Sequence, residues 1–200
     1  MDKENNDIST ESEVKEAAVD YDKLYTYSDY LKWDDDKRRE LIDGVPYLMS
    51  APGTAHQKII GNSHGLFWNF LRGKPCEVYI APFDVRLNAD TLDDTVVQPD
   101  IMIVCDQSKL DNAGIIGAPD MVIEILSPST SKYDKTTKFN KYQESGIREY
   151  WIIDPEAKTL EVNTLNDRSY ITSPYTAEDI VPVNVLDGCN ISMAEVFERV

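Results

Sequence analysis

Cysteine is scarce in this chain, and long hydrophobic runs are missing from it. Three of the 200 residues are cysteine, namely Cys76, Cys105 and Cys189. They are too few and too scattered for a disulfide framework or a cysteine-rich zinc site. We expect three thiols in a reducing compartment, which favours a cytoplasmic protein. No stretch approaches the ~20 consecutive apolar residues that a membrane-spanning helix requires, so no membrane association is expected.

The start of the chain lacks both the basic segment and the apolar segment of a secretory signal. Residues 1–20 contain seven acidic residues, two lysines and no aromatic residue. A segment of this composition cannot bury enough apolar surface to fold by itself. The sequence therefore predicts a disordered acidic tail over residues 1–20 and a single folded domain over residues 21–200.

Positive charge is also in short supply. Lysine and arginine number 20 against 36 aspartates and glutamates, which gives a formal net charge of −16 at pH 7. Proteins that grip duplex DNA usually carry a basic patch, because phosphate contacts supply most of their non-specific affinity. The balance disfavours tight, unassisted DNA binding, although a local basic groove remains compatible with it.

Short and nearly continuous apolar runs dominate the middle of the sequence. They lie at residues 77–81, 101–105, 121–126 and 150–153. Runs of this length without alternation are typical of strands that are covered on both faces. Residues 133–144 have a helical composition and end near Gly146, so residues 121–153 predict a strand–helix–strand unit.

The flanking segments carry helix and turn signals. Thr26, followed three residues later by Asp29, predicts a capped short helix. Asp43-Gly44 predicts the turn of a hairpin, and residues 54–72 have the spacing of one long amphipathic helix. The remaining expected elements are a hairpin at residues 158–171 and a short helix at residues 192–200. The fold class is α/β (an α+β mixed sheet), with a central mixed β-sheet flanked by helices.

Two acidic residues stand in otherwise apolar strand segments. Asp100 opens the run at residues 101–105, and Glu124 interrupts the run at residues 121–126. A carboxylate in a buried strand is costly unless it has a cation, a cluster of donors or a chemical role. The alternative is an acid at a strand end that faces water, which fits Asp100 better than it fits Glu124.

The helical segment that follows offers a basic partner. Asp134, Lys138 and Tyr142 are spaced four residues apart, so they share one face of a helix. On its own, this pattern also fits an ordinary solvated Asp–Lys pair.

Taken together, these motifs resemble the Uma-type restriction endonuclease family, a branch of the PD-(D/E)XK nuclease superfamily. The resemblance is carried by Pro99-Asp100, by Glu124-Ile125-Leu126-Ser127-Pro128-Ser129-Thr130, by Asp134, Lys138 and Tyr142, by the block from Glu149 to Pro155, and in the front half by Glu40 to Gly44 and His56. It extends from about Tyr25 to Val200.

The resemblance implies a restriction endonuclease-like core and a set of site residues. Asp100 and Glu124 would be metal ligands, with the backbone carbonyl of Ile125. Leu126 stands where the superfamily usually has its catalytic lysine, and Lys138 is the matching position in this branch. Glu40 matches an acidic position that supports the metal site. Oxygen ligands of this kind suit Mg²⁺ or Mn²⁺.

The function implied is divalent-metal-dependent hydrolysis of DNA phosphodiester bonds by an endonuclease, which acts as a homodimer if it cuts two strands. The alternative is a catalytically weak or inactive nuclease-fold protein that serves as a binding or regulatory module. His56 either makes a polar contact near the site or has a packing or capping role at the start of its helix. No Gly-x-Ser-x-Gly or Gly-x-Gly-x-x-Gly motif supports a serine hydrolase or a dinucleotide-binding protein.

Overall fold

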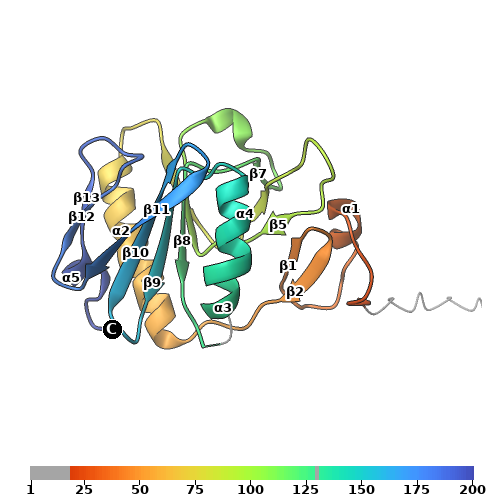
Figure 1. The fold of residues 1–200 in the computed structure, drawn as a ribbon, viewed down its shortest axis with the longest axis horizontal. Helices are drawn as coiled ribbons and strands as arrows, with labels where there is room; N and C mark the ends of the chain where they lie inside the picture. Colours follow the sequence, from red (N-terminus) through yellow and green to blue (C-terminus); the bar gives the residue numbers. More distant parts are fainter. Residues whose placement is uncertain (1–18, 129–130) are drawn as a thin grey trace, which may run out of the picture.

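The structure is a computed structural model that describes residues 19–128 and 131–200, which form two larger β-sheets, a third sheet of two strands, and flanking helices (Figure 1). The expected acidic tail lies almost entirely outside the described residues, as do Ser129 and Thr130 of the motif after Glu124. No helix within the described part is long and apolar enough to cross a membrane.

The larger sheet has six strands in the order β11-β10-β9-β8-β6-β3. Its strands are β3 (Glu77–Ile80), β6 (Ile101–Val104), β8 (Met121–Ile125), β9 (Glu149–Asp154), β10 (Thr159–Asn166) and β11 (Ser169–Thr176). Strands β8 and β9 are parallel, and all other neighbours in this sheet are antiparallel. The parallel pair needs a crossover, which the helical segment between the two strands provides. The predicted strand–helix–strand unit is therefore confirmed.

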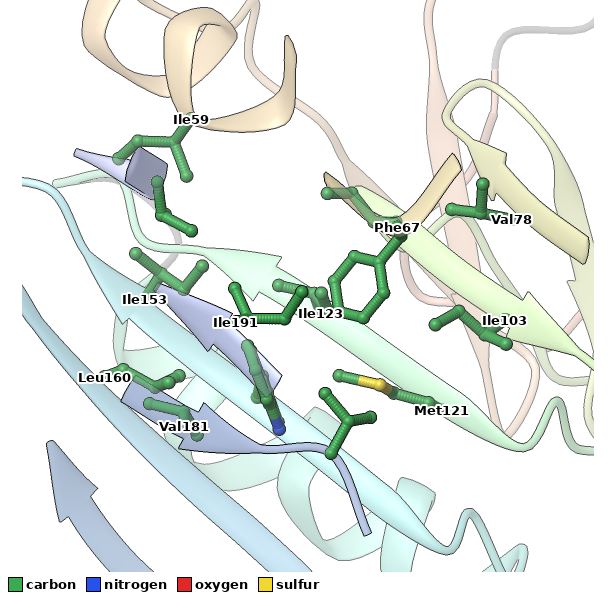
Figure 2. Close-up of a cluster of buried hydrophobic side chains, with 14 of the residues drawn as sticks. Ile59, Phe67, Val78, Ile103, Met121, Ile123, Ile153, Leu160, Val181 and Ile191 are labelled. Atoms are coloured by element: carbon green, nitrogen blue, oxygen red, sulfur yellow. The ribbon is translucent and has the colours of Figure 1, made fainter. Parts of the chain in front are cut away.

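One face of this sheet is covered by α2 (Thr54–Leu71), by the ribbon of β12 (Ile180–Pro182) and β13 (Asn190–Ser192), and by α5 (Met193–Val196). Figure 2 shows Phe67 of α2 lying over the central strands, near Ile123 and Met121. Strand residues alternate between the two faces. Ile101, Ile103 and Ile123 belong to this core, whereas Met102 and Val122 belong to the core on the opposite face.

The opposite face packs against the helical segment of α3 (Ser131–Tyr133), η2 (Asp134–Lys138) and α4 (Phe139–Glu144) and against the second sheet. That sheet has the order β2-β1-β5-β4-β7. Its strands are β1 (Arg39–Ile42), β2 (Val45–Leu48), β4 (Asp84–Arg86), β5 (Val96–Val97) and β7 (Gly114–Ile116). The sequence did not predict the last three, because strands of two or three residues are too short to show a period.

The predicted hairpin and first helix are both present. Asp43 and Gly44 have φ values of 50° and 77°, the left-handed conformation that a two-residue hairpin turn requires at both positions. Strand β2, which contains Pro46, lies at the edge of its sheet, where a proline need not remove a hydrogen bond between strands. Helix α1 (Tyr27–Tyr30) begins with a capping box between Thr26 and Asp29.

Three expectations about the elements were wrong. Strand β3 is an edge strand rather than a central one. The helix at residues 133–144 is interrupted by a π-helical stretch, η2. The last helix is limited to α5, with the Ser192 side chain accepting a hydrogen bond from the Glu195 N–H at its start. A 3-10 turn, η1 (Gln107–Lys109), follows β6.

The expectation of three free thiols was also wrong. Cys76 and Cys105 are joined by a disulfide, and Cys189 is free and buried. The cause is the antiparallel pairing of β3 with β6. Glu77 pairs with Val104, so the two cysteines, one residue beyond this pair, face each other at the end of the ladder. The inference of a reducing compartment therefore loses the support of two of its three thiols.

Candidate active site

Asp100 and Glu124 face each other across two neighbouring strands. Ile101 of β6 pairs with Ile123 of β8 in antiparallel register, so the next pair outward is Asp100 and Glu124. Opposite residues in such a ladder project from the same face of the sheet, with Cβ atoms roughly 5 Å apart. Asp100 Oδ2 also accepts a hydrogen bond of 2.8 Å from the Ile125 N–H. The strand register therefore brings both carboxylates to one place.

Glu124 is a buried acid because of strand alternation. Its neighbours Ile123 and Ile125 point into the core under α2, so Glu124 points to the other face, toward the helical segment that follows β8. Only 4% of the residue is exposed. A carboxylate at this depth requires donors, and the helical segment supplies two of them.

Lys138 is the first of these donors. Its Nζ lies 2.8 Å from Glu124 Oε1, 2.9 Å from Glu40 Oε1 and 3.7 Å from Asp134 Oδ1. Lys138 ends the π-helical stretch η2, a rare conformation that is frequent at functional sites. The ammonium is thus shared among carboxylates from β1, β8 and its own helical segment.

Tyr142, one turn further along α4, is the second donor. Its hydroxyl donates a hydrogen bond of 2.7 Å to Glu124 Oε1, the same oxygen that Lys138 contacts. Burial and the nearby Glu124 raise the pKa of the Tyr142 hydroxyl, so it keeps its proton and remains a donor. The shared helix face predicted for Asp134, Lys138 and Tyr142 is therefore directed at a buried acid and not at solvent.

Glu40 enters the site from the second sheet. It lies in β1 and is 1% exposed. Its Oε1 accepts a hydrogen bond of 2.8 Å from the Gln98 N–H in addition to the Lys138 contact. The small sheet therefore positions one wall of the site, which explains why a segment far away in the sequence reaches β8.

His56 approaches from the opposite side, in the first turn of α2. Its Nε2 lies 3.1 Å from Asp100 Oδ2. Its Nδ1 is buried and has no hydrogen-bond partner within the described residues. Of the two roles considered from the sequence, the polar contact near the site is the one that these distances favour.

The charged residues of this group and His56 line one cavity of about 260 Å³. Its charged lining consists of Arg38, Glu40, Asp100, Glu124, Asp134 and Lys138, with His56 beside them. The rings of Tyr47 and Tyr133, 4.6 Å apart between centroids, form part of the wall. This cavity is therefore not the local basic groove that the charge balance left open, because carboxylates outnumber basic side chains in its lining.

The excess of acid has electrostatic consequences. Burial raises the pKa of Glu124 well above its usual value, and Asp134, Asp100 and Glu40 raise it further, while Lys138 opposes them. Burial alone would lower the pKa of the Lys138 ammonium, but Glu124, Glu40 and Asp134 outweigh burial and raise it. Lys138 is therefore charged at neutral pH, and it is one cation among several acids.

The donor set fits a hard cation only in part. Among residues 19–128 and 131–200, no three His, Cys, Asp or Glu side chains are grouped so as to hold a metal ion together. Lys138 occupies the position between Glu40 and Glu124 that a third ligand would need. Two carboxylates and a carbonyl remain, from Asp100, Glu124 and Ile125. That set fits Mg²⁺, which usually retains several waters.

The sequence did not assign roles to three of the contacting groups. They are the Gln98 N–H that binds Glu40, the Tyr142 hydroxyl that binds Glu124, and the Ile125 N–H that binds Asp100. The two backbone donors leave no signal in a sequence. Tyr142 could have been found from its spacing of four residues from Lys138 together with the buried acid they share.

Comparison with known proteins places the chain in a family. A model of the Uma2 family, described as "Putative restriction endonuclease", matches residues 27–194. The uncharacterized Synechocystis protein slr1290 is 28% identical over 155 residues, which are 76% of this chain and 80% of that protein. A second uncharacterized Synechocystis protein, sll1609, is 24% identical over 164 residues, or 78% of this chain and 90% of that protein.

A crystal structure has the same fold. It is that of a protein from Anabaena variabilis described as "a putative nuclease belonging to DUF820", and it matches with a TM-score of 0.71 and 22% identity over 87% of this chain and 98% of that chain. This likeness confirms the predicted mixed α/β fold, and the family match confirms the predicted resemblance. The family model covers most of the sequence, and the chain therefore belongs to the Uma2 family.

Proposed function

We propose that this chain is a divalent-metal-dependent DNA endonuclease, which hydrolyses phosphodiester bonds at the cavity between β1, β8 and η2. The observation that carries the proposal is the excess of acid in that cavity. Four carboxylates line it, from Glu40, Asp100, Glu124 and Asp134, against the two basic side chains of Arg38 and Lys138. Clustered carboxylates repel one another, and a bound cation would offset this repulsion.

Asp100 and Glu124 would hold the ion, with the Ile125 carbonyl and water as further ligands. The all-oxygen set selects Mg²⁺ or Mn²⁺ over softer metals. When bound, the ion neutralises negative charge on the phosphodiester and lowers the pKa of a water molecule. The family and fold support the nuclease assignment, and the oxygen donors support the choice of ion.

The side chains of the cavity have the remaining tasks. Lys138 would donate hydrogen bonds to phosphoryl oxygens as negative charge develops on them. Glu40 and Asp134 would keep the Lys138 ammonium charged and in position, since both lie within ion-pair distance of it. His56 and the Ile125 N–H would fix the Asp100 carboxylate, because both contact its Oδ2.

A plasmid-nicking assay with Mg²⁺ or Mn²⁺ tests the proposal. Asp100→Asn should lower the cleavage rate about 10²-fold or more, the scale on which the loss of an electrostatic stabiliser acts. The matched control is Asp106→Asn. Asp106 lies just beyond the other end of β6 and caps η1, and asparagine is an equally good cap. Equal activity of the two variants would contradict the proposal.

The net charge of −16 favours a second candidate function, a nuclease-fold module that binds without turnover. Calorimetry with Mn²⁺ alongside the nicking assay separates the two. Heat of binding without nicking of several DNA substrates supports the module. Heat together with nicking that depends on Asp100 supports the endonuclease.

A further inference from the structure

Arg38 and Arg39 are neighbours in the sequence but have different surroundings. Arg39 is 2% exposed, and its Nη1 and Nη2 lie 2.6 and 2.5 Å from the two carboxylate oxygens of Asp35. Arg38 is exposed and lines the cavity. Successive residues at the start of a strand point in opposite directions, so the chain directs the Arg39 guanidinium to the partly exposed carboxylate of Asp35 and the Arg38 guanidinium to the mouth of the candidate active site.

The Arg38 guanidinium is held by a neutral side chain. Its Nε and Nη2 donate hydrogen bonds of 3.2 and 2.8 Å to Gln98 Oε1. The Gln98 amide is itself oriented, because its Nε2 donates to Asp84 Oδ1 at 2.8 Å and to the Tyr30 hydroxyl at 3.1 Å. This network fixes which end of the amide meets Arg38, and hence where the guanidinium lies.

The charge of Arg38 is not neutralised by an ion pair. Within the part of the chain that the structure describes, no carboxylate lies within 4.0 Å of its guanidinium nitrogens, whereas Lys138 contacts three carboxylates. A guanidinium has five N–H donors, and a planar fork of two of them matches two oxygens of a phosphate. Gln98 occupies only part of this donor set.

We propose that Arg38 is a substrate-binding residue, whose guanidinium binds a backbone phosphate of the DNA strand that enters the cavity. This inference rests on the proposed endonuclease function. A cavity lined by four carboxylates repels the DNA polyanion, and the proposed role of Arg38 addresses this repulsion. A fixed and unpaired guanidinium at the mouth offsets that repulsion where the strand enters. The hydrogen bonds to Gln98 already restrict the Arg38 side chain, so it loses less conformational entropy on binding DNA.

The test compares Arg38→Gln with Lys37→Gln. Lys37 is exposed, lies next to Arg38 and does not line the cavity, so both variants lose one positive charge at nearly the same place. The measurements are the Kd for a short fluorescent DNA duplex as a function of salt, and kcat and KM for nicking. Arg38→Gln should raise Kd and KM about tenfold or more and lower the slope of log Kd against log salt by about one.

The Lys37→Gln control should leave Kd and KM close to wild type. Arg38→Lys should keep most of the salt slope, because the charge remains, but should bind less tightly than wild type, because the fork is lost. Unfolding by urea should be unchanged in Lys37→Gln and only slightly shifted in the two Arg38 variants, which lose hydrogen bonds to Gln98.

The outcomes separate this inference from the function on which it rests. If the wild-type protein binds and cuts DNA while Arg38→Gln matches Lys37→Gln, the assignment of Arg38 is overturned and the endonuclease stands. A fall in kcat with unchanged KM and salt slope also overturns the assignment, because Arg38 then acts on the cavity and not on the substrate. If the wild-type protein neither binds nor cuts DNA, both proposals fail.

Discussion

The Lys138 Nζ lies 2.8 Å from Glu124 Oε1, and neither side chain is more than 5% exposed. One residue comes from a helical segment and the other from the centre of the larger sheet. The pair is almost fully buried, so each charge depends on the other and on the acids around them.

Removal of the amine should be strongly destabilising. Lys138→Met leaves Glu40, Glu124 and Asp134 without their shared cation, and loss of one partner of a buried pair costs about 3–5 kcal/mol. Urea unfolding at pH 7 measures the loss. The double variant Lys138→Met with Glu124→Gln should be less destabilised than the sum of the two single variants. Additive effects would contradict a direct interaction.

His56 should control how tightly the ion is bound. His56→Ala removes the ring that contacts Asp100, and partners of this kind typically contribute 10–100-fold to metal affinity. Calorimetric titration with Mn²⁺ measures the change. His64 lies in the same helix and stacks near Trp68, with a centroid distance of 6.2 Å, so His64→Ala is the control. Equal affinities for the two variants would show that the contact with Asp100 does not support metal binding.

The Tyr142 hydroxyl should contribute more to stability than the Tyr150 hydroxyl. Tyr142 donates to the carboxylate of Glu124 at 2.7 Å, and Tyr150 donates to the backbone carbonyl of Asp134 at 3.2 Å. Hydrogen bonds to charged groups contribute about 1.5–3 kcal/mol, against about 0.5–1.5 kcal/mol for neutral pairs. Tyr142→Phe should therefore lower the free energy of unfolding more than Tyr150→Phe. The reverse order in urea titrations would count against a charged Glu124.

Glu149 should make the protein less stable as the pH rises. Burial raises the pKa of Glu149 above its ordinary value of 4.5, so the folded state holds the proton more tightly than the unfolded state. The stability difference between wild type and Glu149→Gln should thus fall as the pH rises from about 4.5 through the raised pKa, and should be constant above it.

Asp179 should make the protein more stable as the pH rises, the opposite of the effect expected for Glu149. Hydrogen bonds from the Thr176 N–H and hydroxyl hold the pKa of Asp179 below 3.8. Its contribution is present above pH 3.8 and is lost as the pH falls through the lowered pKa. Urea titrations between pH 3 and 8 should give a difference from Asp179→Asn that rises with pH. Slopes of the same sign for the two sites would contradict the burial argument for Glu149.

The elements that the sequence predicted well are those with a strong local signal. The hairpin has its Asp43-Gly44 turn, helix α2 has a helical period, and the strand that contains Glu124 is a continuous apolar run. The other three strands of the second sheet were missed because β4, β5 and β7 have three residues or fewer and depend on tertiary pairing. The disulfide was missed because it follows from the register of β3 with β6, which no local pattern specifies.

In the candidate site, too, the sequence identified some features and missed others. The four residues named from the sequence, Glu40, Asp100, Glu124 and Lys138, line one cavity, and their catalytic roles stay predictions. What the sequence could not give is the identity of each partner. The donors from Gln98 and Ile125 are backbone N–H groups, which every residue except proline has, so no residue type marks them in a sequence. The contact of His56 with Asp100 depends on how α2 packs on the sheet.

The π-helical stretch η2 puts the amine of the site on a different element from the carboxylates. A lysine at position 126 would directly follow the strand that carries Glu124, whereas Lys138 lies on η2 and contacts both Glu124 of β8 and Glu40 of β1. The candidate site is therefore built from elements that lie far apart in the sequence, and no single local segment contains all of its residues. Under the proposed function, nuclease activity should vanish in step with the loss of tertiary structure as denaturant is added, with no active intermediate in between.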